Sequence, residues 1–169
     1  MRLVAILVAA SGCFGTHQPR GHWNAARRQV CAGDVCYRVG ELPGWSLLRQ
    51  KHAEVAFFDH GTDSIAQANA TCRDDADAAS LDVLMSHLLI GYTEIHQRTQ
   101  ERVQLDAREA LHQIADVKLD GVPRVLDLYV LKRNGCIFDL SLAAPPDRYA
   151  AAAAQFARFV AGFAEESSS

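Results

Sequence analysis

After Cys13, the 169-residue sequence contains no apolar run long enough to cross a bilayer, which takes about 20 residues as a helix. It also lacks a large excess of charge: the formal net charge is −3. No stripe of basic residues interleaved with aromatic ones occurs, and such a stripe is typical of nucleic-acid-binding surfaces. The chain is therefore expected neither to span a membrane beyond its first residues nor to bind nucleic acid.

Motifs of the common catalytic centres are missing as well. The sequence has no Gly-rich phosphate loop, no H-E-x-x-H zinc motif and no G-x-S-x-G nucleophile elbow. From these absences we expect no cofactor, no bound metal and no enzymatic activity.

The first residues carry the most specific signal. Leu3 to Ala10 is apolar throughout, about half the length of a membrane span, and matches the hydrophobic region of a secretory signal. The following Ala10-Ser11-Gly12-Cys13 resembles the lipobox of bacterial lipoproteins. This resemblance implies a signal peptide at residues 1–12, acylation of Cys13 and attachment to membrane lipid, because two or more acyl chains anchor a protein stably. The alternative is a buried N-terminal strand with an ordinary thiol at Cys13.

Residues 13–29 are predicted to form a flexible tether. Phe14 to Asn24 contains Gly, Pro, Thr, Gln and Asn without periodicity, which is typical of a linker. Phe14 also stands where enterobacterial lipoproteins that stay at the inner membrane have Asp. We therefore expect a cell-envelope location, with the outer membrane favoured over the inner membrane.

Four cysteines remain after Cys13: Cys31, Cys36, Cys72 and Cys136. An even number in an exported chain favours two disulfides, with three possible pairings. Cys31 and Cys36 could close a tight turn, leaving Cys72 to pair with Cys136 across the fold, a bridge worth on the order of 4 kcal/mol. Free thiols and a metal site are the alternatives, although C-x4-C spacing fits zinc ligands poorly.

Residues 30–164 are predicted to form one α+β domain, a single antiparallel sheet of about five to seven strands with helices packed on it. Residues 165–169 are predicted to be a disordered tail. We expect strands or hairpins at 30–39, 54–59, 64–72, 108–119, 122–132 and 136–142, and a loop followed by a strand at 94–104. A helix over 81–89 follows from apolar residues spaced i, i+3, i+4, i+7, and a last helix opens at 145–147. The Asn134-Gly135 pair favours a tight hairpin turn.

Several segments together resemble a known group. These segments are the Leu-Pro-Gly turn before Trp45, His87 to Tyr92, Lys118 to Pro123, Val130 to Asp139 and Phe159 to Phe163. They resemble uncharacterised lipoproteins of myxobacteria and related deltaproteobacteria over residues 35–163. The order of elements is also similar to the fold of the photosystem II extrinsic proteins and of a nuclear Ran-binding factor. This resemblance implies a docking scaffold without a characteristic catalytic centre.

The polar residues offer only weak candidate sites. The loop from Asp59 to Asp63 could bind a cation, or form a polar hairpin turn. Asp74, Asp75 and Asp77 could bind calcium, or cap a helix together with Ser80. Asp139 lies on a predicted strand and needs a partner if it is buried, for which Arg108, Arg124 and Lys118 are candidates.

The leading hypothesis is a non-enzymatic, membrane-anchored envelope lipoprotein that acts as a binding or docking module, with a possible envelope protein partner. A first alternative is a cryptic thiol- or metal-assisted hydrolase that uses Cys136, with His87 or His112 as base. A second alternative is an assembly or chaperone-like accessory protein, which rests on the docking fold alone.

Overall fold

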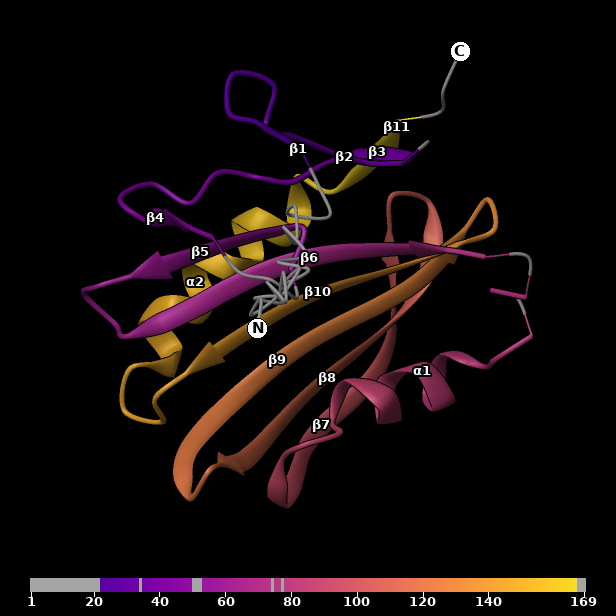
Figure 1. Ribbon diagram of the computed structural model, residues 1–169. Coiled ribbons are helices and arrows are strands. Elements are labelled where there is room, and N and C mark those ends of the chain that lie inside the picture. The colour runs from indigo at the N-terminus through magenta and orange to yellow at the C-terminus, as the bar shows by residue number, and fades with distance from the viewer. Residues whose placement is uncertain (1–21, 34, 50–52, 74, 77, 167–169) are drawn as a thin grey trace, which may run out of the picture.

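The computed structural model describes residues 22–33, 35–49, 53–73, 75–76 and 78–166. Strands dominate this part of the chain, and two short helices accompany them (Figure 1). The strands are β1 (His22–Asn24), β2 (Gln29–Ala32), β3 (Val35–Arg38), β4 (Ser46–Leu48), β5 (Val55–Asp59), β6 (Ser64–Cys72), β7 (Thr93–Leu105), β8 (Arg108–Leu119), β9 (Val122–Arg133), β10 (Cys136–Ala144) and β11 (Ala164–Glu166). The helices are α1 (Leu81–Leu88) and α2 (Tyr149–Ala161).

Seven of these strands form a large antiparallel sheet in the order β4-β5-β6-β10-β9-β8-β7. The strands predicted at 54–59, 64–72, 108–119, 122–132 and 136–142 are all present. Asn134 and Gly135 have positive φ angles of 50° and 73° at the β9–β10 turn, the conformation that an Asn-Gly hairpin turn requires. Local turn chemistry therefore determines how this part of the sheet is connected.

The predicted architecture, an α+β fold with a single sheet, is wrong. The chain is mostly β and contains a second sheet of four strands, in the order β1-β2-β3-β11. The hairpin of β2 and β3 does not join the large sheet, because its free edge pairs with the C-terminal strand β11, in which Glu165 lies opposite Tyr37. A three-residue polar strand has no hydrophobic periodicity, so the sequence pattern could not reveal it.

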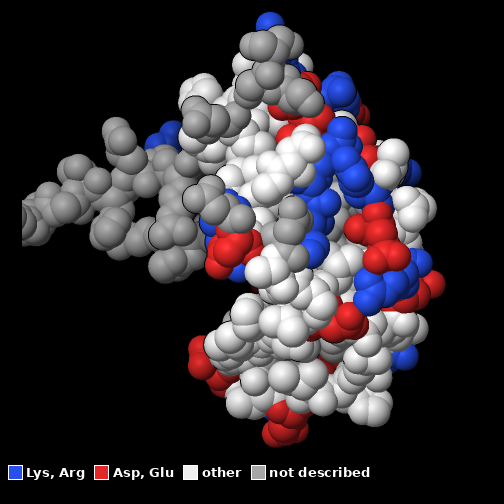
Figure 2. Space-filling view, turned by 90° about the vertical axis from the view of Figure 1, so that its right-hand side faces the viewer, with Lys and Arg blue, Asp and Glu red and all other residues white. Residues whose placement is uncertain are grey.

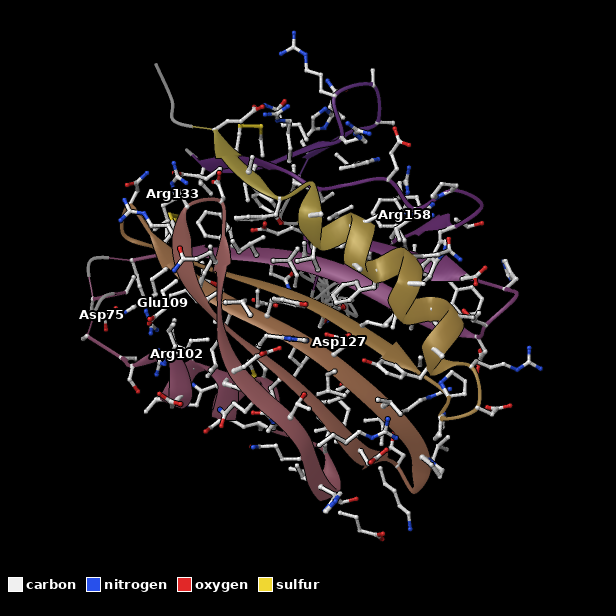
Figure 3. The ribbon with its side chains drawn as sticks, turned by 180° about the vertical axis from the view of Figure 1, so that it is seen from behind. Asp75, Arg102, Glu109, Asp127, Arg133 and Arg158 are labelled. Carbon is white, nitrogen blue, oxygen red and sulfur yellow. A yellow bond between two sulfur atoms is a disulfide. The ribbon has the colours of Figure 1, made fainter. Side chains whose placement is uncertain are left out.

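Residue alternation gives the large sheet two buried faces. On β10, Phe138, Leu140 and Leu142 contribute to the core shared with α2 and the small sheet. Ile137 belongs to a second core, which contains the buried residues Leu81, Leu84 and Met85 of α1. Helix α1 covers the face seen in Figure 1, and α2 covers the face seen from behind in Figure 3. The sheet is thus the middle layer, with a helix on each side.

Strand β7 corrects a second prediction. Residues 94–104 were expected to begin as a loop because they are polar, yet the whole segment is strand at the edge of the sheet. All of its residues are exposed except half-buried Val103 and buried Leu105. An edge strand that is solvated on both faces has no need for apolar alternation, so its sequence does not resemble a strand.

The boundaries at the two ends also differ from the prediction. The predicted tether contains β1 and the first residue of β2, and the predicted tail contains Glu165 and Glu166 of β11. The predicted signal peptide and Cys13 lie outside the described residues. Neither helix in the described ranges is long and apolar enough to cross a membrane.

Two glycines join the small sheet to α2. Gly40 follows β3, Gly162 is the C-cap of α2, and Gly40 N–H donates a hydrogen bond to the Phe159 carbonyl at 2.8 Å. A Cβ on Gly40 would lie 1.9 Å from the Arg158 carbonyl oxygen, and one on Gly162 would lie 2.3 Å from Gly40 Cα. Both distances are far inside van der Waals contact with backbone atoms, which cannot move aside as a side chain can.

We therefore predict that Gly162→Ala destabilises the protein by at least about 2 kcal/mol, because the added methyl separates α2 from the small sheet. Urea denaturation with the full chain measures the change. The matched control is Gly61→Ala, whose new Cβ would have its nearest contact at 3.5 Å, so its effect should stay within about 0.5 kcal/mol. Equal effects of the two variants would contradict the prediction.

Candidate binding pocket

A pocket of about 220 Å³ lies between the end of α1 and the large sheet. Its wall is formed by Leu88 of α1, by Tyr92 in the segment after it and by Leu119 at the end of β8. Its apolar floor comes from strands β6, β9 and β10 and includes Ile65, Leu126, Leu128 and Ala143. The pocket is therefore a gap in the α1-side core that α1 is too short to cover.

Besides the Tyr92 phenol in the wall, three polar side chains interrupt this apolar lining: Gln67 of β6, and Asp139 and Ser141 of β10. Gln67 lies directly opposite Ser141 in the β6–β10 register, and Asp139 lies two residues from Ser141 on the same face. Within the described part of the chain, the Gln67 amide and the Ser141 hydroxyl make no hydrogen bond. Their hydrogen-bonding groups are thus available inside the pocket.

Among the described residues that line the pocket, Asp139 is the only charged one. Its Oδ1 accepts a hydrogen bond from Asn69 Nδ2 at 2.9 Å, and no other described residue donates to this carboxyl. Burial raises its pKa from 3.8 to about 6, although the Asn69 hydrogen bond acts in the opposite direction. The ionised form of Asp139 therefore lowers the free energy of unfolding.

The predicted cationic partner of Asp139 is absent. Arg124 instead forms an ion pair with Asp63 at 3.1 Å, and Lys118 pairs with Glu94 at 2.8 Å. Arg108 lines a different hollow. The prediction was wrong because the partner is set by the register of β6 and β10, which brings Asn69 opposite Asp139.

A chain of hydrogen bonds connects this carboxyl to the small sheet. Asn69 Oδ1 accepts from the Glu54 backbone N–H at 3.0 Å, and the Glu54 carboxylate accepts from the Tyr37 hydroxyl at 2.8 Å. Burial and the facing Glu54 carboxylate raise the pKa of Tyr37, which keeps the hydroxyl a donor. Polar contacts thus run from the pocket to β3 without interruption.

Exposed apolar side chains accompany the residues that line the pocket, as neighbours in the sequence or as partners across a pair of strands. Leu119, which lines the pocket, is 43% exposed, and Val122, its partner across the β8–β9 hairpin, is 50% exposed. Ile90, between the wall residues Leu88 and Tyr92, is 75% exposed. These three residues are called the apolar rim below.

A second polar cluster lies on the opposite face of the sheet. His112 Nε2 is 2.8 Å from Asp127 Oδ1, and its Nδ1 is 3.4 Å from a Glu101 oxygen. Burial lowers the pKa of His112, but the hydrogen bonds and charges of Asp127 and Glu101 outweigh it, so the pKa is raised. Tyr149 of α2 donates to the other Asp127 oxygen at 2.9 Å, and Figure 3 shows Asp127 between the sheet and this helix. Because both ring nitrogens face carboxylates, the cluster favours a protonated imidazole that holds β7, β8, β9 and α2 together.

A larger hollow of about 410 Å³ lies beside the start of α1, but two of the three described cations that line it have partners. Arg102 pairs with Asp82 and Glu109, and Lys132 donates to the Ala79 carbonyl. The same mixture of charges covers the side of the molecule with the β7–β8 and β9–β10 turns, where basic and acidic side chains alternate (Figure 2). This surface presents no continuous charge of one sign, so we regard the Asp139 pocket as the better candidate site.

The cysteines are paired as Cys31–Cys36 and Cys72–Cys136. Each pair lies directly opposite across two antiparallel strands. The sulfur on which the thiol-hydrolase alternative depends, that of Cys136, is therefore bonded to Cys72. His87 lies exposed in the last turn of α1, and no contact joins it to Cys136.

In the part of the chain that the structure describes, the acidic side chains of the two candidate cation-binding loops have structural roles. The Asp59 carboxylate accepts hydrogen bonds from the Gly61 and Thr62 backbone and from the Thr62 hydroxyl, which closes the β5–β6 turn and lowers the pKa of Asp59. Asp75 pairs with Arg73 at 2.9 Å, while Asp74 and Asp77 lie outside the described residues. Ser80 is the N-cap of α1. No group of three or more metal-ligating side chains occurs in the described ranges.

Sequence reasoning missed most of the pocket. Gln67, Asn69 and Tyr92 were not singled out, because each is ordinary in its own segment. One signal was available: Asp139 and Ser141 occupy alternate positions of a strand whose other face is apolar, which places both on one face. What lies opposite them depends on strand pairing between residues about 70 positions apart in the sequence.

Comparisons with solved structures identify similar folds. Cyanobacterial PsbP (CyanoP) from Synechocystis sp. PCC 6803 matches with a TM-score of 0.58 and 14% identity, over 94% of this chain and 99% of that chain. LpqN of Mycobacterium tuberculosis, which is involved in cell envelope biogenesis, matches with a TM-score of 0.55 and 13% identity, over 76% and 82%. PA94, a Pseudomonas aeruginosa protein of unknown function, matches with a TM-score of 0.51 and 10% identity, over 83% and 92%.

No family model matches this chain, and no curated protein matches it. The similarity to CyanoP supports the resemblance to the photosystem II extrinsic-protein fold at the level of the fold alone. No sequence match supports the resemblance to lipoproteins of myxobacteria.

The environment of Asp139 generates a prediction about pH. A carboxyl whose pKa is raised on folding keeps its proton longer in the folded state, so stability falls as the pH rises from about 4 to about 6. Asp139→Asn keeps the shape and the acceptor for Asn69 but removes the charge. At pH 8 the variant should be more stable than wild type by as much as about 3 kcal/mol, and at pH 3.5 the two should be nearly equal. Urea denaturation at both pH values measures this difference, and a variant that is less stable at pH 8 would contradict it.

Proposed function

We propose that this chain is a non-enzymatic binding module of the bacterial cell envelope, anchored to membrane lipid through acylated Cys13, with the outer membrane favoured. The observation that carries the binding role is the pocket beside α1. Its apolar walls enclose three polar side chains, and two of them have no hydrogen-bonding partner in the described part of the chain. Gln67 and Ser141 are half-buried, so their polar groups are open to a ligand that enters the pocket, and a mostly apolar lining with a few convergent polar groups is typical of a binding site.

Two further observations support the envelope location. Disulfides persist in oxidising compartments outside the cytoplasm, and the structure pairs four cysteines in two bridges. One protein of similar fold, LpqN, is involved in cell envelope biogenesis.

The anchor is tested by metabolic labelling with a palmitate analogue in a bacterial host. The full chain should take up label, because the lipobox-like segment directs acylation of Cys13. The labelled chain should fractionate with the outer membrane. Cys13→Ala should lose the label. A full chain that remains unlabelled, with its first residues intact, would overturn the anchor.

The pocket is tested with 1-pentanol, a small neutral amphiphile, in an NMR titration of the full chain carrying Cys13→Ala, which keeps it free of lipid. We expect saturable shifts of residues that line the pocket, such as Leu128, Ser141 and Ala143. Ala143→Phe should abolish them, because its ring fills the space above the floor. A correctly folded wild type that shows no saturable shift, either with 1-pentanol or with its charged analogue n-pentylamine, would overturn the binding role of this pocket.

A further inference from the structure

We propose that the pocket beside α1 selects a primary ammonium group carried on a short apolar chain. This inference rests on the proposed binding function and names the chemistry of the ligand. The three polar groups of the lining receive the ammonium, and the apolar walls receive the chain.

The hydrogen-bonding capacities match. An ammonium group has three N–H donors and no acceptor. The lining offers three oxygen acceptors from neighbouring positions: the Asp139 carboxylate, the Ser141 hydroxyl and the Gln67 amide. Side chains directly opposite on antiparallel strands have Cβ atoms about 5 Å apart, as Gln67 and Ser141 do by register, and Asp139 is the next residue of β10 on that face. One nitrogen above the β6–β10 pair is therefore within reach of all three.

The charge of the pocket also favours a cation. Asp139 has one neutral donor, Asn69, and no ion pair in the described part of the chain. The basic side chains Arg124 and Lys118 are committed to Asp63 and Glu94. A buried carboxylate without a counter-ion repels an anionic ligand and forms a charge-assisted hydrogen bond, which is about twice as strong as a neutral one, with an ammonium group.

Size and lining restrict the rest of the ligand. About 220 Å³ is below the range of about 300–1,000 Å³ that is typical of sites for drug-sized molecules. Leu88, Leu126, Leu128 and Ala143 provide no polar group for the remainder of the ligand. A hydrated inorganic cation would leave these walls unused, whereas a chain of about five carbons buries apolar area against them.

The experiment compares n-pentylamine with 1-pentanol by NMR titration of the same Cys13→Ala chain at pH 7.5. The two ligands have the same chain length and differ in the charged group. Pentylamine should bind at least about tenfold more tightly. Asp139→Asn should remove this preference while leaving pentanol binding within about twofold.

The matched control is Asp120→Asn. It removes one carboxylate from the exposed β8–β9 turn, next to Leu119, and Asn tolerates the local φ of 50°. This variant should keep the full preference for pentylamine. Below pH 6, pentylamine should bind more weakly to wild type as Asp139 takes up its proton, while pentanol should not.

The outcomes separate the two proposals. Pentanol and pentylamine binding with equal affinity, or an amine preference that survives Asp139→Asn, would overturn the ammonium inference and leave the binding function in place. Absence of binding by both ligands would overturn the function as well.

A third ligand distinguishes the source of the ammonium. A short peptide with a central lysine between leucines carries the same group on a polypeptide, and its leucines can contact the apolar rim of Ile90, Leu119 and Val122. If the peptide binds at least about tenfold more tightly than pentylamine, the inference is supported and the source of the ammonium group is a lysine of a protein partner. Pentylamine binding as tightly as the peptide would support it with a free amine as the source.

Discussion

The close contact of Gly40 and Gly162 is the constraint on which the two-sheet architecture depends. Gly40 ends the N-terminal hairpin, Gly162 ends α2, and their backbones approach too closely for any side chain between them. This approach brings β11 alongside β3 immediately after the helix, so the last strand completes the small sheet. It also buries Phe159 and Phe163 beside the large sheet. Two small residues, about 120 positions apart in the sequence, thereby determine how the ends of the chain close the core.

The two faces of the large sheet are closed to different extents, and the pocket follows from that difference. The face under α2 is also covered by the small sheet, and large apolar side chains such as Phe138 and Leu140 fill it. On the other face, the described part of the chain places one helix, α1, which is eight residues long and lies over β8 and β9. Where α1 ends, the alternation of β10 places Asp139 and Ser141 at the positions that apolar residues would otherwise fill. An ionisable group that costs stability is retained there, and natural proteins commonly accept such a cost at functional sites.

Much of the large sheet was predictable because its signals are local. Asn134-Gly135 defines a turn, the apolar spacing from Leu81 defines a helix, and β9 and β10 have clear strand character, whereas β8 alternates imperfectly. The second sheet was not predictable, because β11 is a three-residue polar strand whose formation depends on a partner far away in the sequence. The pocket lies between these cases. The need of Asp139 for a partner follows from its place on a strand, but Asn69 as that partner follows from strand pairing alone.

Among the described strands, the first and the last, β1 and β11, both belong to the small sheet, and the pocket lies on the far face of the large sheet. A mechanical pull applied at His22 therefore acts first on β1 and β2 and is opposed within the hairpin by the covalent Cys31–Cys36 link. The strands of the pocket floor are joined separately by Cys72–Cys136. A force applied at either end of the described chain thus reaches the small sheet before it reaches the strands that shape the pocket.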